Sequence, residues 1–448
     1  MKINVQDVID KGKMNGFFWK VYIICILVVI FDGYDMNIFG PIMPALMADQ
    51  SLGLNPAQAG FLASYALYGM LIGSLFSGAI ADKIGQRKVA MIGILIYSVF
   101  TGFAGFATSY AFLAAMRFIA GLGIASVVPS VLAYVASYTP LKPRGALTTW
   151  INIGLTFGGM LATGVAITWI QSMGWRFMFY VAFVPLLFII LVHFLLPEPM
   201  LIMLRKGNFK KIKETLVKAN PAFEPKDDDE YFVNYQKAAK IPYKNLFTDG
   251  FARNTILICC VNFIAFYLLF GLSTWIPNLM ITKGFALQNS LWMLMTFNSG
   301  TILGTTFGAW ASPKFGYKKM IAIYYSIAAV LLVILSQDLG VTMQLVVLFF
   351  TGATVLGATA QFMSYMAQSY PPTFRSTALG TALAVGRLGG AVGPIIGGVL
   401  LNNNASILVC FLAFAIPAAI NVILISSTKN FTKRDWQAEQ IARDNEEK

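Results

Sequence analysis

Residues 31–35 read Phe-Asp-Gly-Tyr-Asp and lie inside an otherwise apolar stretch from Trp19 to Met47. The stretch is longer than the roughly 20 residues that a transmembrane helix needs, and Asp32 and Asp35 fall near its middle. A charge at that depth costs at least ~2.5–3.5 kcal/mol on insertion scales, so intramembrane acids face a protein interior or a watery cavity. Their i, i+3 spacing puts both on one helix face. The pair indicates an ion or substrate pathway; the alternative is a structural pair held by a buried cation.

The composition is typical of a polytopic helical membrane protein. Of 448 residues, 57% are hydrophobic and 12% are charged, whereas about a quarter of a soluble globular protein is charged. Apolar runs of spanning length recur from end to end, unlike the short alternating segments of a transmembrane β-barrel. The pattern predicts an all-α fold with twelve transmembrane helices, near residues 20–46, 57–80, 89–107, 110–136, 147–169, 176–196, 255–279, 288–310, 319–337, 341–368, 376–400 and 404–426.

The positive charges follow the membrane topology. The formal net charge of +13 would suit a nucleic-acid-binding protein, but the basic residues gather in alternate loops. Arg176 and Lys283 fall on one side, Arg117 and Arg387 fall inside spans, and the remaining Lys and Arg lie on the other side. This positive-inside bias predicts cytoplasmic termini and a cytoplasmic central loop. We expect a multi-pass protein of the inner membrane that binds no nucleic acid.

A single long polar segment divides the spans six and six. We expect an N-terminal six-helix half over 1–203, a cytoplasmic central loop with short helices over 204–253, a C-terminal six-helix half over 254–428 and a cytoplasmic tail over 429–448. The halves repeat each other: residues 78–88 match 308–319, and the stretch from Tyr138 to Arg144 matches that from Tyr370 to Arg375. Such repeats predict two pseudo-symmetric halves related by an axis along the membrane normal.

Two motifs resemble a known superfamily. Residues 78–88, with the pattern Gly-x-x-x-Asp-Lys-x-Gly-x-Arg-Lys, are similar to the loop signature of the major facilitator superfamily, and residues 117–123 resemble its fourth-helix motif. Within it, Asp32-Gly33-Tyr34-Asp35, Tyr267 with Trp275-Ile-Pro277, and residues 386–394 resemble the aromatic acid:proton symporters, the permeases for benzoate and hydroxybenzoates. The resemblance implies the major facilitator fold and a transporter. We expect a monomer without enzymatic activity, cofactor or metal.

Four ionisable groups share one depth in the membrane. At about 1.5 Å per residue, Asp32 and Asp35 lie about 18 and 22 Å above the inner face. Arg117 lies about 10 Å below the outer face and Arg387 about 16 Å above the inner one, so all four occupy the middle of a hydrocarbon core about 30 Å thick.

This matched set suggests a division of roles. Arg387 would bind the substrate carboxylate, because its planar guanidinium matches a carboxylate bidentately and keeps its proton. Asp32 and Asp35 would carry the coupled proton, with Arg117 as their counter-charge, because a carboxyl group loads or releases a proton as it moves relative to a buried cation. The reverse allocation, with Arg117 on the substrate, stays open, as does a structural role for Arg117.

An aromatic acid needs rings for stacking and polar groups for orientation. The candidates are Tyr34, Asn37, Tyr267, Asn298, Gln361 and Tyr365, each of which could instead be a packing residue. By the resemblance, Asp82 pairs with Arg144 and with the start of the eleventh span, and the conformational latch comprises Gly78, Asp82, Gly85, Arg87 and Arg144. The alternative is a solvated turn. Ser137 occupies the position where the family usually has a glutamate near the cytoplasmic end of the fourth helix. The role of that glutamate is therefore either lost in this chain or taken by another residue.

The sequence therefore predicts a secondary transporter that imports an aromatic carboxylate of the benzoate or hydroxybenzoate type with protons, by alternating access. The alternatives are a proton-coupled symporter of another small organic acid, such as muconate or nicotinate, and a proton-driven drug exporter. Arg387 disfavours the exporter, because a fixed positive charge repels cationic drugs. The ring substituents and the proton stoichiometry are not encoded in any motif.

Overall fold

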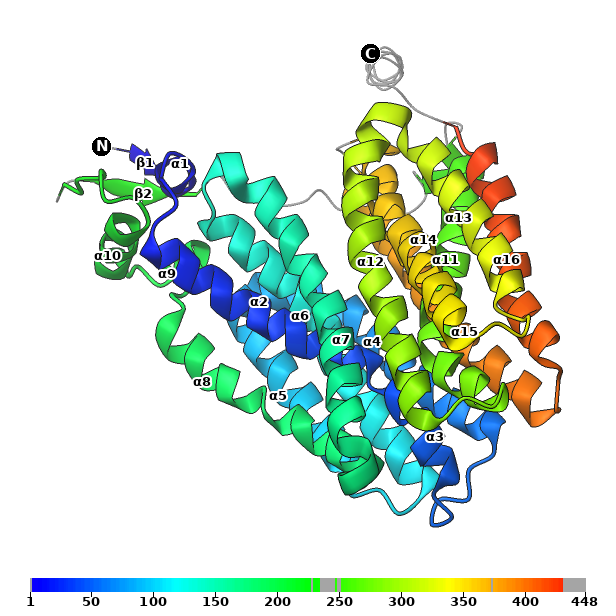
Figure 1. Cartoon of the computed structure of the whole chain (residues 1–448). Helices are drawn as coiled ribbons and strands as arrows, with labels where there is room; N and C mark the ends of the chain where they lie inside the picture. The colour runs from blue at the N-terminus through cyan, green and yellow to red at the C-terminus, as the bar shows by residue number, and fades with distance from the viewer. Residues whose placement is uncertain (1, 227–228, 234–245, 248–250, 372–373, 430–448) are drawn as a thin grey trace. The chain divides into compact units, whose positions relative to one another are not determined.

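A computed structural model describes residues 2–226, 229–233, 246–247, 251–371 and 374–429 (Figure 1). The chain divides into two compact units, Met1–Lys237 and Ala238–Lys448. The predicted all-α class is confirmed, and each of the twelve predicted spans coincides with helix in the described residues. The expected tail at 429–448 lies outside the described residues from position 430 onward.

In the first unit, the helix α6 packs against several neighbouring helices (Figure 1). The helices of this unit's spans are α2 (Gly16–Asn37), α3 (Phe39–Ala48), α4 (Pro56–Ile84), α5 (Gln86–Ala104), α6 (Tyr110–Tyr138), α7 (Leu141–Tyr180), the 3-10 helix η1 (Val181–Phe183) and α8 (Leu186–Leu195). The side chains of Asn15, Asn55 and Ser109 cap the starts of α2, α4 and α6, which satisfies backbone N–H groups that lack intrahelical partners. The helix α6 contacts α2, α4 and α5, while α2 also packs on α7.

Three of the predicted helix limits differ for local reasons. The first span is divided between α2 and α3 at Ile38, because Pro41 has no N–H to donate to the carbonyl of Asn37. The fifth and sixth spans meet at Gly174, whose φ of 73° is a backbone conformation that favours glycine. The sixth span is then interrupted before α8, at Pro185.

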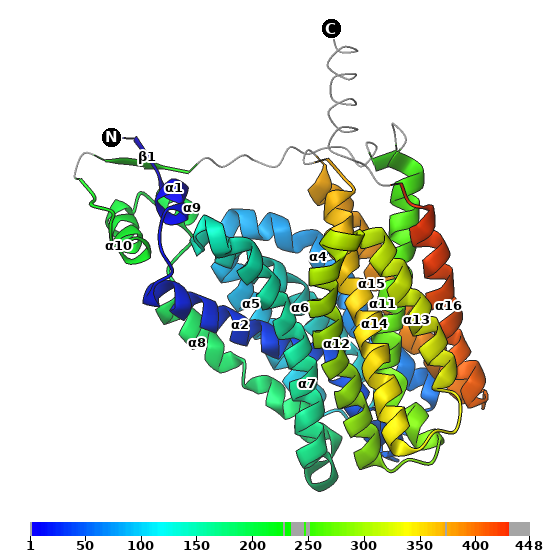
Figure 2. The same ribbon diagram turned by 45° about the horizontal axis from the view of Figure 1, so that its top comes forward.

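A small assembly forms at the N-terminal end of α2 (Figure 2). It contains β1 (Lys2–Asn4), α1 (Val5–Asp10), α9 (Met200–Arg205), α10 (Phe209–Ala219) and β2 (Glu230–Phe232). The strands β1 and β2 pair in parallel, with Ile3 opposite Tyr231. Asn15 Nδ2 donates to the Lys218 carbonyl at 2.8 Å, and Asn220 Nδ2 donates to the Val8 carbonyl at 3.0 Å. The segment before the first span is therefore bound to the central polar segment.

A cluster of hydrogen bonds around Asp49 lies at the opposite end of this unit, after α3. Asp49 accepts hydrogen bonds from Trp175 Nε1 at 2.8 Å and from Arg176 Nη1 at 2.7 Å, and the Ser51 N–H donates to it at 2.9 Å. Hydrogen bonds from Ser51, above all, and from Trp175 and Arg176 hold the pKa of the Asp49 carboxyl below its usual range. This carboxylate joins the end of the first span to the turn between the fifth and sixth spans.

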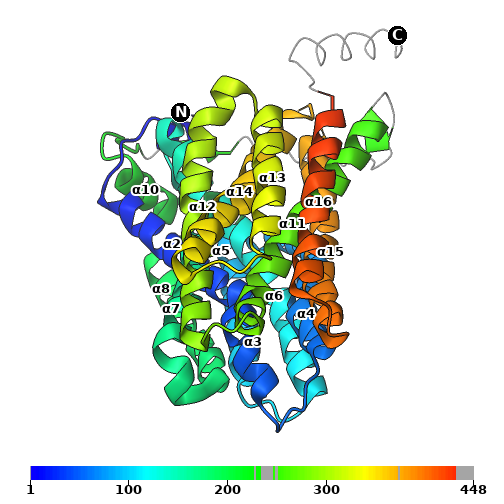
Figure 3. The same cartoon turned by 45° about the vertical axis from the view of Figure 1, so that its right-hand side comes forward.

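The second unit repeats the packing of the first. Its helices are α11 (Phe251–Thr282), α12 (Leu287–Phe315), α13 (Tyr317–Ile334), α14 (Val341–Gln368), α15 (Arg375–Asn402) and α16 (Ile407–Ser427). The helix α11 packs on α15 as α2 packs on α7, and α12 packs on α14 as α4 packs on α6. Figure 3 shows α12, α13 and α16 next to one another. The repeat seen in the sequence is therefore a repeat of packing.

The two short repeated motifs do the same work in each unit. Arg144 Nε donates to the Thr139 carbonyl at 3.1 Å, and Arg375 Nε donates to the Tyr370 carbonyl at 3.2 Å. In both cases the arginine, five residues further along the chain, binds a carbonyl just past the preceding helix, where a cation is favoured.

Candidate functional site

A buried ion pair lies inside the first unit. Arg117 Nη1, on α6, donates to Asp35 Oδ1, on α2, at 2.9 Å. The same nitrogen donates to Thr101 Oγ1 on α5 at 3.2 Å, and Nη2 donates to the main-chain oxygen of Asp35 at 3.3 Å. The guanidinium carbon lies 5.1 Å from the ring centroid of Phe39. Asp35 is fully buried and Arg117 is 1% exposed, so the charges interact in a medium that screens them far less than water does.

Asp32 lies one turn from this pair and shares none of its hydrogen bonds. The residue is 0% exposed, and neither carboxyl oxygen has a hydrogen-bond partner in the described part of the chain. One buried arginine therefore faces two buried acids, of which it contacts one. An ionised Asp32 would be an unpaired buried charge, which is costly. The protonated form of Asp32 avoids that cost in this conformation.

A close contact between two helices sets the direction of the acids. A side chain at Gly33 would overlap the backbone of Leu155 on α7, and one at Gly158 would overlap the backbone of Ile30 and Tyr34 on α2. The helices α2 and α7 therefore touch through their backbones along this face. Gly33 lies between the two acids in sequence, so its close approach to α7 determines which face of α2 the carboxyl groups occupy.

The predicted substrate residues of the first unit bind main-chain oxygens. The Tyr34 hydroxyl donates to the Met178 carbonyl at 2.7 Å, and Tyr34 is fully buried. Asn37 Nδ2 donates to the Gly33 carbonyl at 2.9 Å, in the last turn of α2. Both side chains support the local fold in this conformation, and their contact with substrate stays a prediction.

Arg387 occupies a different environment in the second unit. It lies near the middle of α15 and is partly buried. Within the described residues, no hydrogen bond or ion pair of Arg387 is found. Just before it, Gly386 lies against the amide of Asn262 on α11, which donates to the Ala382 carbonyl at 2.6 Å. Arg387 is thus a cation in a membrane span whose five donors are available to an anion.

The other predicted substrate residues are buried in the second unit. Tyr267 donates to the Ala413 carbonyl at 3.0 Å, and Gln361 Nε2 donates to the Thr305 carbonyl at 3.2 Å. Asn298 is 6% exposed and also has an interaction partner. These contacts are packing contacts within the unit, and a contact of these residues with substrate stays a prediction.

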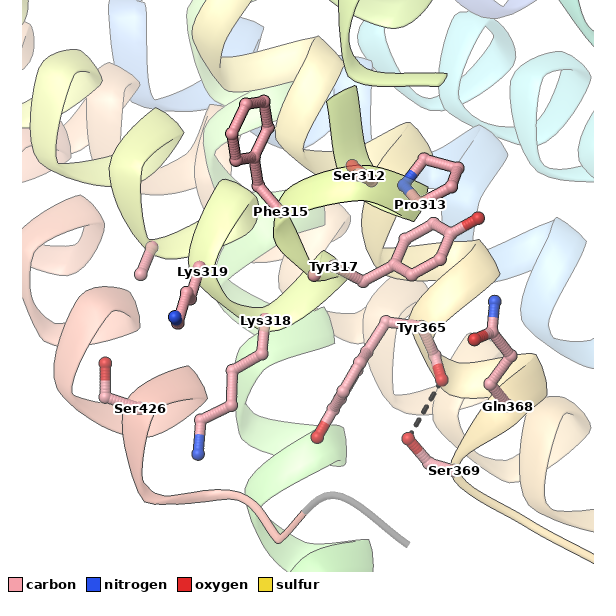
Figure 4. Close-up of a pocket in the computed structure, with 12 residues that line it drawn as sticks. Ser312, Pro313, Phe315, Tyr317, Lys318, Lys319, Tyr365, Gln368, Ser369 and Ser426 are labelled. Atoms are coloured by element: carbon pink, nitrogen blue, oxygen red, sulfur yellow. Dashed lines mark hydrogen bonds between the residues drawn. The ribbon is translucent and has the colours of Figure 1, made fainter. Parts of the chain in front are cut away.

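Tyr365 lines a cavity of about 930 Å³ beside the turn between α12 and α13 (Figure 4). Its hydroxyl donates to Thr428 Oγ1 at 2.6 Å, and its carbonyl accepts from Ser369 Oγ at 2.9 Å. Lys318 and Lys319 line the same cavity. Of the residues predicted to bind substrate, only Tyr365 is among those lining this cavity. The cavity is therefore not the predicted carboxylate site around Arg387.

The predicted latch residues lie at the turn between α4 and α5. Gly85 connects the two helices with a φ of 90°, a backbone conformation that favours glycine. Arg87 donates to the His193 carbonyl, and Arg205 Nη1 donates to the Asp82 carbonyl at 2.8 Å. Gly78 faces open space. This turn is therefore joined to α8 and α9.

Arg144 is engaged elsewhere in this conformation. It forms an ion pair with Asp10, at the end of α1. The predicted contacts of Asp82 with Arg144 and with the eleventh span stay predictions. Ser137, in the place of the family's usual glutamate, donates from Oγ to the Tyr134 carbonyl at 2.7 Å.

Sequence reasoning missed several polar residues of this unit. Thr101 binds Arg117, Tyr97 and Ser98 share its helix face, and Asp10 pairs with Arg144. A usable signal was present for three of them, since Tyr97, Ser98 and Thr101 recur at i, i+1 and i+4 within an apolar span. Asp10 lies in a polar segment, where one more acid carries no signal.

Comparison with known proteins agrees with this fold. The model of the Major Facilitator Superfamily matches residues 25–335 and 289–442. The benzoate transport protein of Acinetobacter baylyi is 32% identical over 448 residues, covering 98% of this chain and 95% of that protein. The 4-hydroxybenzoate transporter PcaK of the same organism is 30% identical over 94% of this chain and 93% of its own length.

A third relative and a solved structure extend the comparison. The gentisate transporter of Corynebacterium glutamicum is 33% identical over 89% of this chain and 84% of its own length. Among solved structures, the D-xylose-proton symporter aligns with a TM-score of 0.71 at 17% identity, over 92% of this chain and 98% of that one. At that identity the structural likeness concerns the fold alone.

Proposed function

Because the chain belongs to the major facilitator superfamily and, within it, to the aromatic acid:proton symporter family, we propose that it imports an aromatic carboxylate of the benzoate or hydroxybenzoate type together with protons. The observation that carries the proposal is the excess of buried acid over buried base around Arg117. Among the residues that the structure describes, Asp32 has no partner for a negative charge, so it is the group that most needs a proton in this conformation. The names of the relatives support the substrate class.

The two acids take different roles in this proposal. Asp35 is the fixed partner of Arg117, because one guanidinium nitrogen donates to its carboxylate and the other to its main-chain oxygen, and a charge-assisted hydrogen bond is about twice as strong as a neutral one. Asp32 carries the coupled proton. It loads the proton when the site is open to the outside and releases it to water when the site opens to the cytoplasm.

Arg387 binds the carboxylate of the substrate. Its fork of donors suits a carboxylate, and no partner within the described residues competes for it. A guanidinium that lies inside a membrane span without an acid is expensive unless it faces a watery cavity or a ligand. We propose that this cost is relieved when an aromatic carboxylate binds.

Transport proceeds by alternating access in the inner membrane, with both termini cytoplasmic. The positive-inside pattern supports this orientation. Carrying one proton with a monocarboxylate makes the step electroneutral, whereas a second proton would make it electrogenic. The protein acts as a monomer in this proposal, because each element of the site belongs to one chain.

The test is uptake into proteoliposomes with an imposed proton gradient, acidic outside. The substrate panel is benzoate, hydroxybenzoates, muconate, nicotinate and a lipophilic cation. We expect accumulation of an aromatic acid that collapses when a protonophore is added. Asp32→Asn should abolish gradient-driven accumulation, while the matched change Asp338→Asn, at an exposed acid, should leave it intact.

Other outcomes would contradict the proposal. Accumulation of muconate or nicotinate alone would show that the substrate belongs to another class of organic acid. Movement of the cation only, against proton flow, would overturn both the symport and the role of Arg387. Full accumulation by Asp32→Asn would show that Asp32 does not carry the coupled proton.

A further inference from the structure

Two more buried hydroxyl groups belong to the interior that contains Asp32. Tyr97 and Ser98, on α5, are both 0% exposed. Their side chains lie close to each other, but neither hydroxyl forms a well-aligned hydrogen bond with any described residue. Leaving a buried hydroxyl unpaired costs free energy. Apolar residues would fill the same space without that cost, so these hydroxyls call for an explanation.

Helix geometry places both hydroxyls at the level of Asp32. Arg117 bonds to Asp35 on α2 and to Thr101 on α5, which puts those two residues at one level. Successive spans alternate in direction, so α2 and α5, the first and third, run the same way. Asp32 is three residues before Asp35, while Ser98 and Tyr97 are three and four before Thr101. One turn on each helix therefore brings all three to a common level, one turn from the residues that Arg117 joins.

The electrostatic surroundings agree with this placement. Tyr97 is close enough to Asp32 and Asp35 for a negative charge on either carboxyl group to act on its hydroxyl. The other charged group near Asp32 is Arg117, which is turned toward Asp35. The remaining titratable groups of the helices packed on α2 lie toward the ends of α6, α7 and α8 or on α10: Tyr110, Tyr134, Tyr138, Lys142, Arg144, Arg176, Tyr180, His193, Lys210, Lys211, Lys213, Glu214 and Lys218.

We infer that Tyr97, assisted by Ser98, is a positioning residue for the coupled proton: its hydroxyl donates to Asp32 once that carboxyl has lost its proton. The inference rests on the proposed function. Asp32 gives its proton to water on the open side, and Tyr97 keeps its own proton throughout. The ionised carboxylate then has a donor with the short, strong O–H to O⁻ geometry, so proton release no longer leaves an unpaired buried charge.

The test removes one oxygen atom, with Tyr97→Phe. Loss of the donor disfavours ionised Asp32, so the proton is held to higher pH. The alkaline limb of proton-driven benzoate uptake should move up by roughly one to two pH units, the size of one hydrogen bond to a charge. Net uptake at neutral pH should fall about tenfold or more, because proton release becomes slow. Counterflow exchange of benzoate at acid pH, which needs no proton release, should change less than about twofold.

Tyr325→Phe is the matched control. Tyr325, on α13 of the second unit, is also 0% exposed, and its hydroxyl forms no well-aligned hydrogen bond with the described residues. Unlike Tyr97, it is not under the influence of a nearby carboxyl group. It should behave as the unmodified protein does. Ser98→Ala should shift the alkaline limb in the same direction as Tyr97→Phe, by a smaller amount.

Two results would overturn the inference. One is a Tyr97→Phe pH profile that superimposes on that of the unmodified protein. The other is an equal loss of counterflow and net uptake, which would make Tyr97 a structural or substrate-contacting residue. Failure of the proposed function is separable, because the unmodified protein would then show no gradient-driven accumulation, or Asp32→Asn would keep it.

Discussion

Arg117 donates to both the carboxylate and the main-chain oxygen of Asp35, yet Asp32, one turn away on the same helix, receives no hydrogen bond from it or from any other described residue. Two acids that look equivalent in the motif are therefore different in the structure. One belongs to a fixed charge pair, and the other is the odd charge that a proton can neutralise. This difference is the basis of coupling in the proposed mechanism.

Breaking the Arg117–Asp35 pair from one side should be strongly destabilising. Arg117→Gln or Asp35→Asn leaves one buried charge without its partner, which typically costs about 3–5 kcal/mol. The double variant Arg117→Gln with Asp35→Asn leaves no unpaired charge and should recover most of the lost stability without recovering uptake. Thermal unfolding in detergent measures this, and additive losses in the double variant would show that the residues do not act as a pair.

The close approach of α2 and α7 should make Gly33 intolerant of even one methyl group. Gly33→Ala places a Cβ against the Leu155 backbone, and overpacking of this kind costs roughly 1–3 kcal/mol. Because the shift also turns the acids, uptake should fall with stability. The matched control is Gly380→Ala on α15, where a Cβ meets nothing within 4 Å; it should be neutral or stabilising by about 0.5–1 kcal/mol.

The hydrogen bonds around Asp49 predict a dependence of stability on pH. Hydrogen bonds from Ser51 first, and then from Trp175 and Arg176, lower the pKa of Asp49 in the folded protein. A lowered folded-state pKa means stabilisation that is fully present above the unfolded pKa of about 3.9 and is lost as the pH falls below it. The difference in melting temperature between the unmodified protein and Asp49→Asn should be constant from pH 7 to pH 5 and shrink toward pH 3. A difference that grows on acidification would contradict the assignment.

Arg387 should tolerate neither a change of charge nor a change of shape. Arg387→Lys keeps the charge but loses the bidentate fork, so KM for benzoate should rise about tenfold or more, the value of one charge-assisted hydrogen bond. Arg387→Gln should raise KM further. The control is Arg375→Lys, because Arg375 binds a main-chain carbonyl outside the spans. An unchanged KM in Arg387→Lys would favour Arg117 as the residue that binds the substrate carboxylate.

Much of the fold was predictable from the residues alone. The break at Ile38 could have been predicted as well, since Pro41 removes the hydrogen bond four residues earlier. The assembly of β1, α1 and α10 was not predictable, because its short elements lie in polar segments without clear periodicity. The same holds for the Asp10–Arg144 ion pair, which joins residues 134 positions apart.

The sequence alone was enough to predict twelve apolar helices and the four charged side chains that lie within them. The reason is that hydrocarbon thickness sets helix length, and the cost of a buried charge makes each exception informative. Packing was needed to learn that Arg117 selects Asp35 and also bonds to Thr101. A hydrogen bond depends on the rotation and separation of helices to within a few tenths of an ångström, and those follow from contacts such as Gly33 against α7 rather than from any local pattern.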